Sequence, residues 1–310
     1  MLLQEIIHII ESVAPLSYQE SWDNSGLQVG DPRADIHAAL LTTDITESVV
    51  SEAISLGCNL IISHHPLLFR GVKHICGNTP QERCIIQAIR HDIAIYSAHT
   101  SMDAYIHGVS GKMADQLGIT AYRILSPAEF TEDAPTVSRA VITGDAGVSP
   151  AVKEVRSPGR TNEENNQDNT SALQLSNYKL SNCQIPHGLG VIGNLPAPMP
   201  YEDFLRMVKA RFQAPYLRYT RALTPEVQTI ALCGGAGAEF AEEAISQGAD
   251  VFITADVKYH EMQAAEGRIA LVDMDHWVSE HFTRNIFQDL LQSHLPTYIS
   301  TTDRTPVNLL

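Results

Sequence analysis

Apolar and polar residues alternate along the first part of the chain as expected for a series of helices and short strands. Apolar positions at helical spacing predict helices over about 2–14, 46–56, 80–91 and 109–117. Short apolar runs between these helices predict strands at about 38–43, 59–63 and 93–97. Strands that alternate with helices in this way indicate an α/β lobe.

The same alternation resumes after about residue 200. Here the pattern predicts helices over about 201–213, 238–247, 257–266 and 276–294. It predicts strands at about 228–233, 250–254, 269–273 and 297–300. The chain is therefore expected to hold a second α/β lobe.

The stretch between the lobes has a different composition. Residues 156–172 are polar, rich in Asn and nearly free of large apolar side chains, which predicts a mobile loop. On either side, VSRAVITG and NYKLSNCQ each have the composition of a strand. We therefore predict three parts, an N-terminal lobe, an insertion and a C-terminal lobe, at 1–125, 126–188 and 189–310.

Two segments of the second lobe repeat segments of the first in the same order. EAISLGCNLII at 52–62 matches EAISQGADVFI at 243–253, and each reads as a helix, a glycine at its end and a strand. Further on, a strand is followed by His99 and, four residues later, Asp103; another is followed by His276 and, four residues later, Glu280. We infer a pseudo-duplicated architecture of two similar α/β lobes that face a cleft and contribute strand-end residues to one site.

His64 and His65 stand where the apolar strand NLIIS ends, and Pro66 prevents a regular continuation. Loops at the carboxyl ends of strands are where α/β folds place ligand sites. Adjacent side chains diverge, so two neighbouring imidazoles can reach two metal ions a few Å apart. The alternative is a pair of loop histidines bonded to backbone groups.

His276 and Glu280 have i, i+4 spacing at the start of a predicted helix and so share one face. An imidazole and a carboxylate at this spacing can grip a divalent ion, and the carboxylate can also bridge two ions. Chance surface pairs with this spacing are common. The position after an apolar strand, and the repeat at His99 and Asp103, favour a functional pair.

Two residues of the first lobe are ambiguous. Asp103 lies after the strand IAIYS, where a carboxylate serves either as a metal ligand or as a helix cap. His99 is interpreted as a support, a substrate contact or a proton shuttle, for which its titration range is suitable, and not as a ligand.

Several other polar segments allow two interpretations. Trp22, Asp23 and Asn24 form a turn that either supports the site or is structural. Lys258, Tyr259 and His260 follow the strand VFIT and are expected near the same face. The sequence GGAG at 234–237 suits either a phosphate site or a tight turn from strand to helix, because it lacks the rest of a nucleotide-binding motif.

Composition and charge argue against several classes of protein. The sequence has no run of 18 apolar residues and starts with an amphipathic helix rather than a signal peptide, so we expect no membrane span and a cytoplasmic protein. Five scattered cysteines without a C-x-x-C pair argue against a disulfide scaffold. The net charge of −15 argues against nucleic acid as a partner, but two bound metal ions can make one cleft locally positive.

Five segments together resemble the GTP cyclohydrolase I type 2 homologues, also called Nif-three-like proteins. They span both lobes: SWDNSGLQVGDP at 21–32, IISHHPLLFRGVK at 61–73, YSAHTSMD at 96–103, TADVKYHE at 254–261 and VDMDHWVSE at 272–280. The resemblance implies two related α/β lobes, a ring-shaped homohexamer and a site for two divalent metal ions per chain. The implied metal ligands are His64, His65, Asp103, His276 and Glu280.

The sequence also departs from the family pattern. The insertion is of intermediate size, and DRTP at 303–306 replaces a more acidic or amidic segment, so Arg304 would alter the charge at the cleft rim if this segment lies there. A metal site built from imidazoles and carboxylates, without thiolates, can bind zinc, iron, manganese, nickel or cobalt.

The leading hypothesis is a metal-dependent hydrolase that uses metal-activated water, with His99 as the catalytic acid or base. The resemblance suggests GTP as its substrate, with opening of the purine imidazole ring towards a dihydroneopterin-type product. The alternative is a metal-binding regulatory or scaffold protein that acts through protein partners without turnover.

Overall fold

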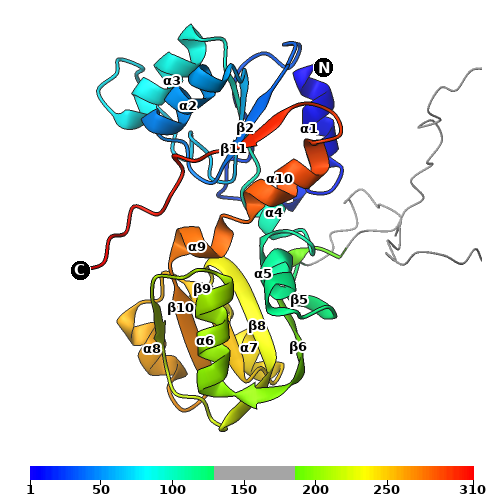
Figure 1. The fold of residues 1–310 in the computed structure, drawn as a ribbon, viewed down its shortest axis with the longest axis vertical. Helices are drawn as coiled ribbons and strands as arrows, with labels where there is room; N and C mark the ends of the chain where they lie inside the picture. Colours follow the sequence, from blue (N-terminus) through cyan, green and yellow to red (C-terminus); the bar gives the residue numbers. More distant parts are fainter. Residues whose placement is uncertain (129–185) are drawn as a thin grey trace, which may run out of the picture. The chain divides into compact units, whose positions relative to one another are not determined.

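Two mixed β-sheets, each with helices against both faces, form the framework of the protein (Figure 1). The structure is a computed structural model that describes residues 1–128 and 186–310. Helices and strands alternate along both halves of the chain, so the predicted mixed α/β fold class is confirmed.

The first sheet has the strand order β1-β4-β3-β2-β11. Its strands are β1 (Gly26–Val29), β2 (Ala39–Thr42), β3 (Leu60–Ser63), β4 (Ala94–Ser97) and β11 (Thr297–Ile299). All neighbours are parallel except β1, which runs antiparallel to β4 at one edge.

The second sheet has the strand order β5-β6-β8-β9-β10-β7. Its strands are β5 (Tyr122–Pro127), β6 (Gly188–Pro200), β7 (Leu217–Tyr219), β8 (Glu226–Ala236), β9 (Val251–Ala255) and β10 (Ala270–Met274). The strands β8, β9 and β10 are parallel, whereas β5, β6 and β7 pair antiparallel with their neighbours.

The two sheets share a repeated unit. In each, three consecutive strands are parallel, β2-β3-β4 in one sheet and β8-β9-β10 in the other, and a short antiparallel strand borders the last of them. In each, a helix ends at a glycine in the left-handed region, Gly57 or Gly248, before the central strand begins. The sequence repeat therefore corresponds to equivalent elements, in agreement with the predicted similarity of the two lobes.

Helices cover the sheets because their apolar faces match the apolar strands. The helices are α1 (Leu3–Glu11), α2 (Glu47–Leu56), α3 (Pro80–Arg90), α4 (Thr100–Asp103), α5 (Val109–Leu117), α6 (Tyr201–Arg211), α7 (Ala241–Ser246), α8 (Tyr259–Ala265), α9 (His276–Glu280) and α10 (Thr283–Leu291). On the first sheet, α1 and α10 pack on one face, and α2 and α3 on the other. On the second sheet, α5 and α6 pack on one face, and α7 and α8 on the other.

The last elements of the chain return to the first sheet. The strand β11 pairs in parallel with β2, and Ile286, Phe287 and Leu291 of α10 join the core formed by α1, so the orange and red end of the chain lies among the blue elements in Figure 1. Conversely, β5 belongs to the second sheet. Over residues 1–128 and 186–310 the chain thus crosses between the two sheets twice, which apolar periodicity alone does not reveal.

Most predicted elements agree with the structure within a few residues, and the differences have local causes. The helix predicted over 276–294 is divided into α9 and α10 at His281 and Phe282. The strands β1, β5, β6 and β7 were not predicted, because glycine, proline and polar or charged residues interrupt their apolar pattern.

The predicted insertion at 126–188 falls almost entirely outside the described residues, as do its mobile loop and both of its strands. The three-part division of the chain therefore stays a prediction. Among the described residues, none of the helices has the length and apolar character needed to cross a bilayer.

Glu52 of α2 fixes the segment that follows β11. Its carboxylate accepts hydrogen bonds from the Oγ of Ser300 and from the backbone N and Oγ1 of Thr301 and Thr302. Partial burial raises the pKa of Glu52, but these hydrogen bonds outweigh it and lower the pKa to about 2. The stabilisation is therefore present above about pH 4.5 and is lost as the pH falls from there towards 2.

We predict that Glu52→Gln lowers the free energy of unfolding at pH 7 by about 1–2 kcal/mol, because hydrogen bonds to a charged acceptor are lost. Urea denaturation at pH 7 and pH 3.5 measures this, and the difference from the wild type should shrink at the lower pH. The exposed Glu226→Gln serves as the control. Equal stabilities of wild type and Glu52→Gln at pH 7 would contradict the assignment.

Candidate metal centre

The predicted metal ligands lie at the carboxyl ends of parallel strands. His64 and His65 follow β3, and their backbone N–H groups continue the pairing by donating to the carbonyls of Thr42 and Thr43. Asp103 ends α4, the short helix after β4, and His276 and Glu280 begin and end α9, the short helix after β10. The side chain of Asp275 caps α9 by accepting a hydrogen bond from the N–H of Val278, which fixes the start of that helix.

Glu280 is the common neighbour of the three histidines. Its Oε2 lies 2.8 Å from Nε2 of His65 and 3.0 Å from Nε2 of His276. Its Oε1 lies 3.6 Å from Nε2 of His64, which is also 3.6 Å from Oδ1 of Asp103. The structure thus brings all five predicted residues together in two groups, His65 with His276 and His64 with Asp103, and both groups share Glu280.

Each histidine near Glu280 is oriented by a hydrogen bond on its far side. The Nδ1 of His64 is 3.0 Å from the carbonyl of Ala98, that of His65 is 2.8 Å from Asp44, and that of His276 is 2.7 Å from Asp256. With the Nδ1–H donated outwards, Nε2 of a neutral imidazole presents its lone pair to the group around Glu280. Histidines that bind metals commonly have this arrangement.

Asp44 and Asp256 were not predicted as site residues, although they follow predicted strands, as the predicted ligands do. Asp44 follows the predicted strand 38–43, and Asp256 follows the predicted strand 250–254. Asp256 also has a φ of 56°, a left-handed conformation that is uncommon outside glycine. Lys258, Tyr259 and His260, which we expected near the site, are exposed on the first turn of α8.

Three buried polar atoms of this group make no hydrogen bond of normal geometry, although imidazole nitrogens lie 2.8–3.6 Å from the carboxylate oxygens. Glu280 is only 3% exposed, and the Nε2 of His64, the Oδ1 of Asp103 and the Oε2 of Glu280 are buried without a partner in hydrogen-bond geometry. Leaving such atoms unsatisfied destabilises a protein, because each has lost its hydration. Imidazole nitrogens and carboxylate oxygens that converge without partners fit a divalent cation.

Burial and neighbouring carboxylates shift the pKa values of Asp103, His65 and His276. Burial, and then the Glu280 carboxylate, raise the pKa of Asp103. Burial lowers the pKa of His276, but Glu280 and Asp256 outweigh it and raise the pKa to about 9. The pKa of His65 is raised in the same way by Glu280 and Asp44, against its burial. In the absence of a metal, protons on the histidines therefore supply the positive charge that Glu280 requires.

His99 lies beside this group and is held by Asp23. The Nδ1 of His99 is 2.7 Å from Oδ1 of the fully buried Asp23, whose other oxygen accepts hydrogen bonds from Ser25 and Thr100. Burial raises the pKa of Asp23, but the hydrogen bonds from His99 and Thr100 outweigh it and lower the pKa well below its usual range. A nitrogen of His99 also lies within 4.8 Å of ligand atoms of His64 and His65. The turn at Trp22, Asp23 and Asn24 therefore supports the site.

The glycine-rich segment 234–237 packs against Glu280. It includes the end of β8, and Gly235 has a φ of 64° with its N–H donated to Oγ of Ser279. A Cβ at this position would lie 2.2 Å from Oε1 of Glu280. The glycine is thus needed because the carboxylate occupies the space of a side chain, which favours the tight-turn interpretation over a phosphate site.

The segment DRTP lies close to the same residues. The buried Asp303 accepts hydrogen bonds from the N–H of Thr43 and from Nε1 of Trp277, the neighbours of Asp44 and His276. Arg304 is exposed.

Comparison with other proteins gives relatives over nearly the whole chain. A "GTP cyclohydrolase 1 type 2 homolog" of Staphylococcus epidermidis is 28% identical over 96% of this chain and 95% of its own length. The human "NIF3-like protein 1" is 28% identical over 100% of this chain and 93% of its own length.

Solved structures show the same fold. A Staphylococcus aureus protein matches with a TM-score of 0.77 and 26% identity, over 100% of this chain and 99% of that one. A Bacillus cereus protein related to NIF3 matches with a TM-score of 0.76 and 23% identity, over the same shares of both chains. The sequence profile of the family Duf34/NIF3 (NGG1p interacting factor 3) covers residues 1–306, and the chain therefore belongs to the DUF34/NIF3 family, as the resemblance of its motifs suggested.

Proposed function

We propose that this protein is a hydrolase that depends on two divalent metal ions per chain. His64 and Asp103 would hold one ion, His65 and His276 the other, and Glu280 would bridge them. The observation that carries the proposal is the pair of ligand groups that share one buried carboxylate, with unpartnered atoms directed into the group. The donors admit zinc, iron, manganese, nickel or cobalt.

The protein's own residues have separable tasks in this proposal. The chemistry that a pair of divalent ions supplies when bound is Lewis acidity, which makes water nucleophilic near neutral pH. Asp44, Asp256 and the carbonyl of Ala98 orient the histidines through Nδ1. Asp23 orients His99, whose other nitrogen then serves as the acid or base that moves a proton beside the centre.

GTP is the first substrate to test. Several bacterial relatives bear the name GTP cyclohydrolase 1 type 2 homolog, and on that ground we propose GTP as the substrate of this chain. A homohexameric ring and a cytoplasmic location, implied by the resemblance and by composition, stay predictions in the same way.

A binding role without turnover is the rival. The family description, NGG1p interacting factor 3, names a protein that interacts with another protein, and this supports a regulatory or scaffold function. Both functions use the same metal centre, so only turnover separates them.

The decisive experiment measures metal content and GTP consumption together. Purified protein is loaded with zinc, iron(II) or manganese, and ions per chain are counted by mass spectrometry after gel filtration. We predict two ions per chain and metal-dependent consumption of GTP in the wild type. Glu280→Ala should lose at least one ion and the activity, because the bridging carboxylate is gone.

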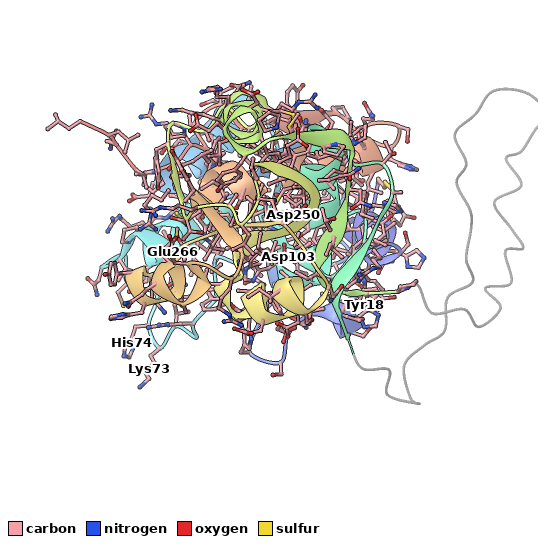
Figure 2. All side chains as sticks on the ribbon, turned by 90° about the horizontal axis from the view of Figure 1, so that it is seen from below. Tyr18, Lys73, His74, Asp103, Asp250 and Glu266 are labelled. Atoms are coloured by element: carbon pink, nitrogen blue, oxygen red, sulfur yellow. The ribbon has the colours of Figure 1, made fainter. Side chains whose placement is uncertain are left out.

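The matched control is Glu266→Ala, which removes a partly exposed glutamate on the segment after α8 (Figure 2) and should behave like the wild type. Two ions per chain without GTP consumption would reject GTP as substrate and favour the binding role. Full metal content in Glu280→Ala would reject the proposed centre itself.

Gly235 gives a test of how Glu280 is positioned. We predict that Gly235→Ala lowers metal content, because the new Cβ would displace the Glu280 carboxylate. The left-handed backbone conformation alone adds about 1 kcal/mol of strain to an alanine. Gly57→Ala controls for that strain, since Gly57 has a φ of 68° and open space around it. A normal metal content in Gly235→Ala, or an equal loss in both variants, would contradict the role of Gly235.

A further inference from the structure

Two large aromatic side chains stand exposed beside the candidate metal centre. Trp22 is 58% exposed and Phe69 is 46% exposed, and both contact the ring of His99. We call Trp22, Phe69 and His99 the aromatic corner. Single exposed aromatic residues are common on protein surfaces, but two that meet on a residue of a polar site require an explanation.

The three rings of the aromatic corner are roughly perpendicular to one another. The ring centroids of Trp22 and Phe69 are 6.0 Å apart at 70°, those of Trp22 and His99 are 6.1 Å apart at 72°, and those of Phe69 and His99 are 6.1 Å apart at 83°. Edge-to-face packing of this kind leaves no slot between the rings. Trp22 and Phe69 each keep a large exposed surface next to His99.

The segments that carry Trp22 and Phe69 are tied to each other. The Nδ2 of Asn24 donates to the carbonyl of Leu68 at 2.8 Å, and the N–H of Leu68 donates to Oε1 of Gln28 at 3.1 Å. Asp23, which lies between Trp22 and Asn24, is fixed by Ser25, Thr100 and His99. The segments that carry the two rings are therefore fixed before any ligand arrives, which reduces the entropic cost of binding.

We propose that the aromatic corner is a binding subsite for a planar heteroaromatic ring, which stacks on Trp22 and meets the edge of Phe69. Such stacking is tolerant of ring identity, because every heteroaromatic base has a π-face. The ring would lie beside His99, the residue assigned above to proton transfer. The link to a reaction rests on the proposed function, whereas the binding itself does not.

The loop that carries Phe69 also carries basic side chains. It has three exposed basic residues, Arg70, Lys73 and His74, of which Lys73 and His74 extend from the surface (Figure 2). Phe69 is the residue of this loop whose ring contacts His99, and together with Trp22 it favours a ligand that is recognised through its ring.

Calorimetric titration of the metal-loaded protein tests the proposal. The probes are guanosine and neopterin, which carry planar rings, and inorganic triphosphate, which carries none. In Trp22→Ala we expect the ring probes that bind the wild type to bind about tenfold more weakly, in line with the energy of base–aromatic stacking. Trp22→Phe should restore most of the affinity, and the binding of triphosphate should not change.

Tyr259→Ala is the matched control, since it removes an exposed aromatic residue outside the aromatic corner and should leave ring binding unchanged. Metal content and thermal stability of each variant verify that the centre and the fold persist. Equal affinity of Trp22→Ala and the wild type for the ring probes would overturn the proposal, as would the failure of both ring probes to bind the wild type.

Sedimentation of the same samples identifies the main competing role. If Trp22→Ala changes the number of chains in the assembly and leaves ring binding unchanged, the aromatic residues form a contact between copies and the subsite is rejected. Ring binding that depends on Trp22 without metal-dependent turnover would keep the subsite and reject the hydrolase. The two proposals can therefore fail separately.

Discussion

The described structure depends on one buried carboxylate that must be matched by positive charge. Glu280 is almost entirely buried, and an isolated carboxylate in such a place is strongly destabilising. Three histidines from two sheets approach it through Nε2, and acceptors on their far sides fix their orientation. A divalent cation, or protons on His65 and His276 when no cation is bound, satisfies the requirement.

The repeated fold explains why these groups meet. In each sheet three parallel strands end at the same edge, and the residues that follow them carry the polar side chains. The return of α10 and β11 to the first sheet joins the two halves beyond the site. Asp303, bonded to Thr43 and Trp277, connects the ends of β2 and α9 directly beside the candidate ligands. The precise placement of Glu280 then requires a glycine at Gly235, because no side chain fits there.

Much of this arrangement could be predicted from local pattern. Apolar periodicity identified β2, β3 and β4 of the first sheet and β8, β9 and β10 of the second, and the spacing of His276 and Glu280 placed both on one turn of helix. What could not be predicted is set by distant contacts. The pairing of β11 with β2 depends on which exposed sheet edge the chain reaches, and the sequence does not encode that locally. Asp44 and Asp256 also follow predicted strands, as the predicted ligands do, but an aspartate in this position is common. Their role in orienting His65 and His276 is visible only where the structure brings each aspartate to its imidazole.

The most direct test of the shared carboxylate is a crystal structure of the zinc-loaded protein with anomalous diffraction recorded on both sides of the zinc absorption edge. The account predicts two anomalous peaks per chain, one among His64, Asp103 and Glu280 and the other among His65, His276 and Glu280. It also predicts that Glu280 is bonded to both ions, either through one shared oxygen or through one oxygen to each ion. A single peak, or two peaks of which only one is bonded to Glu280, would contradict it.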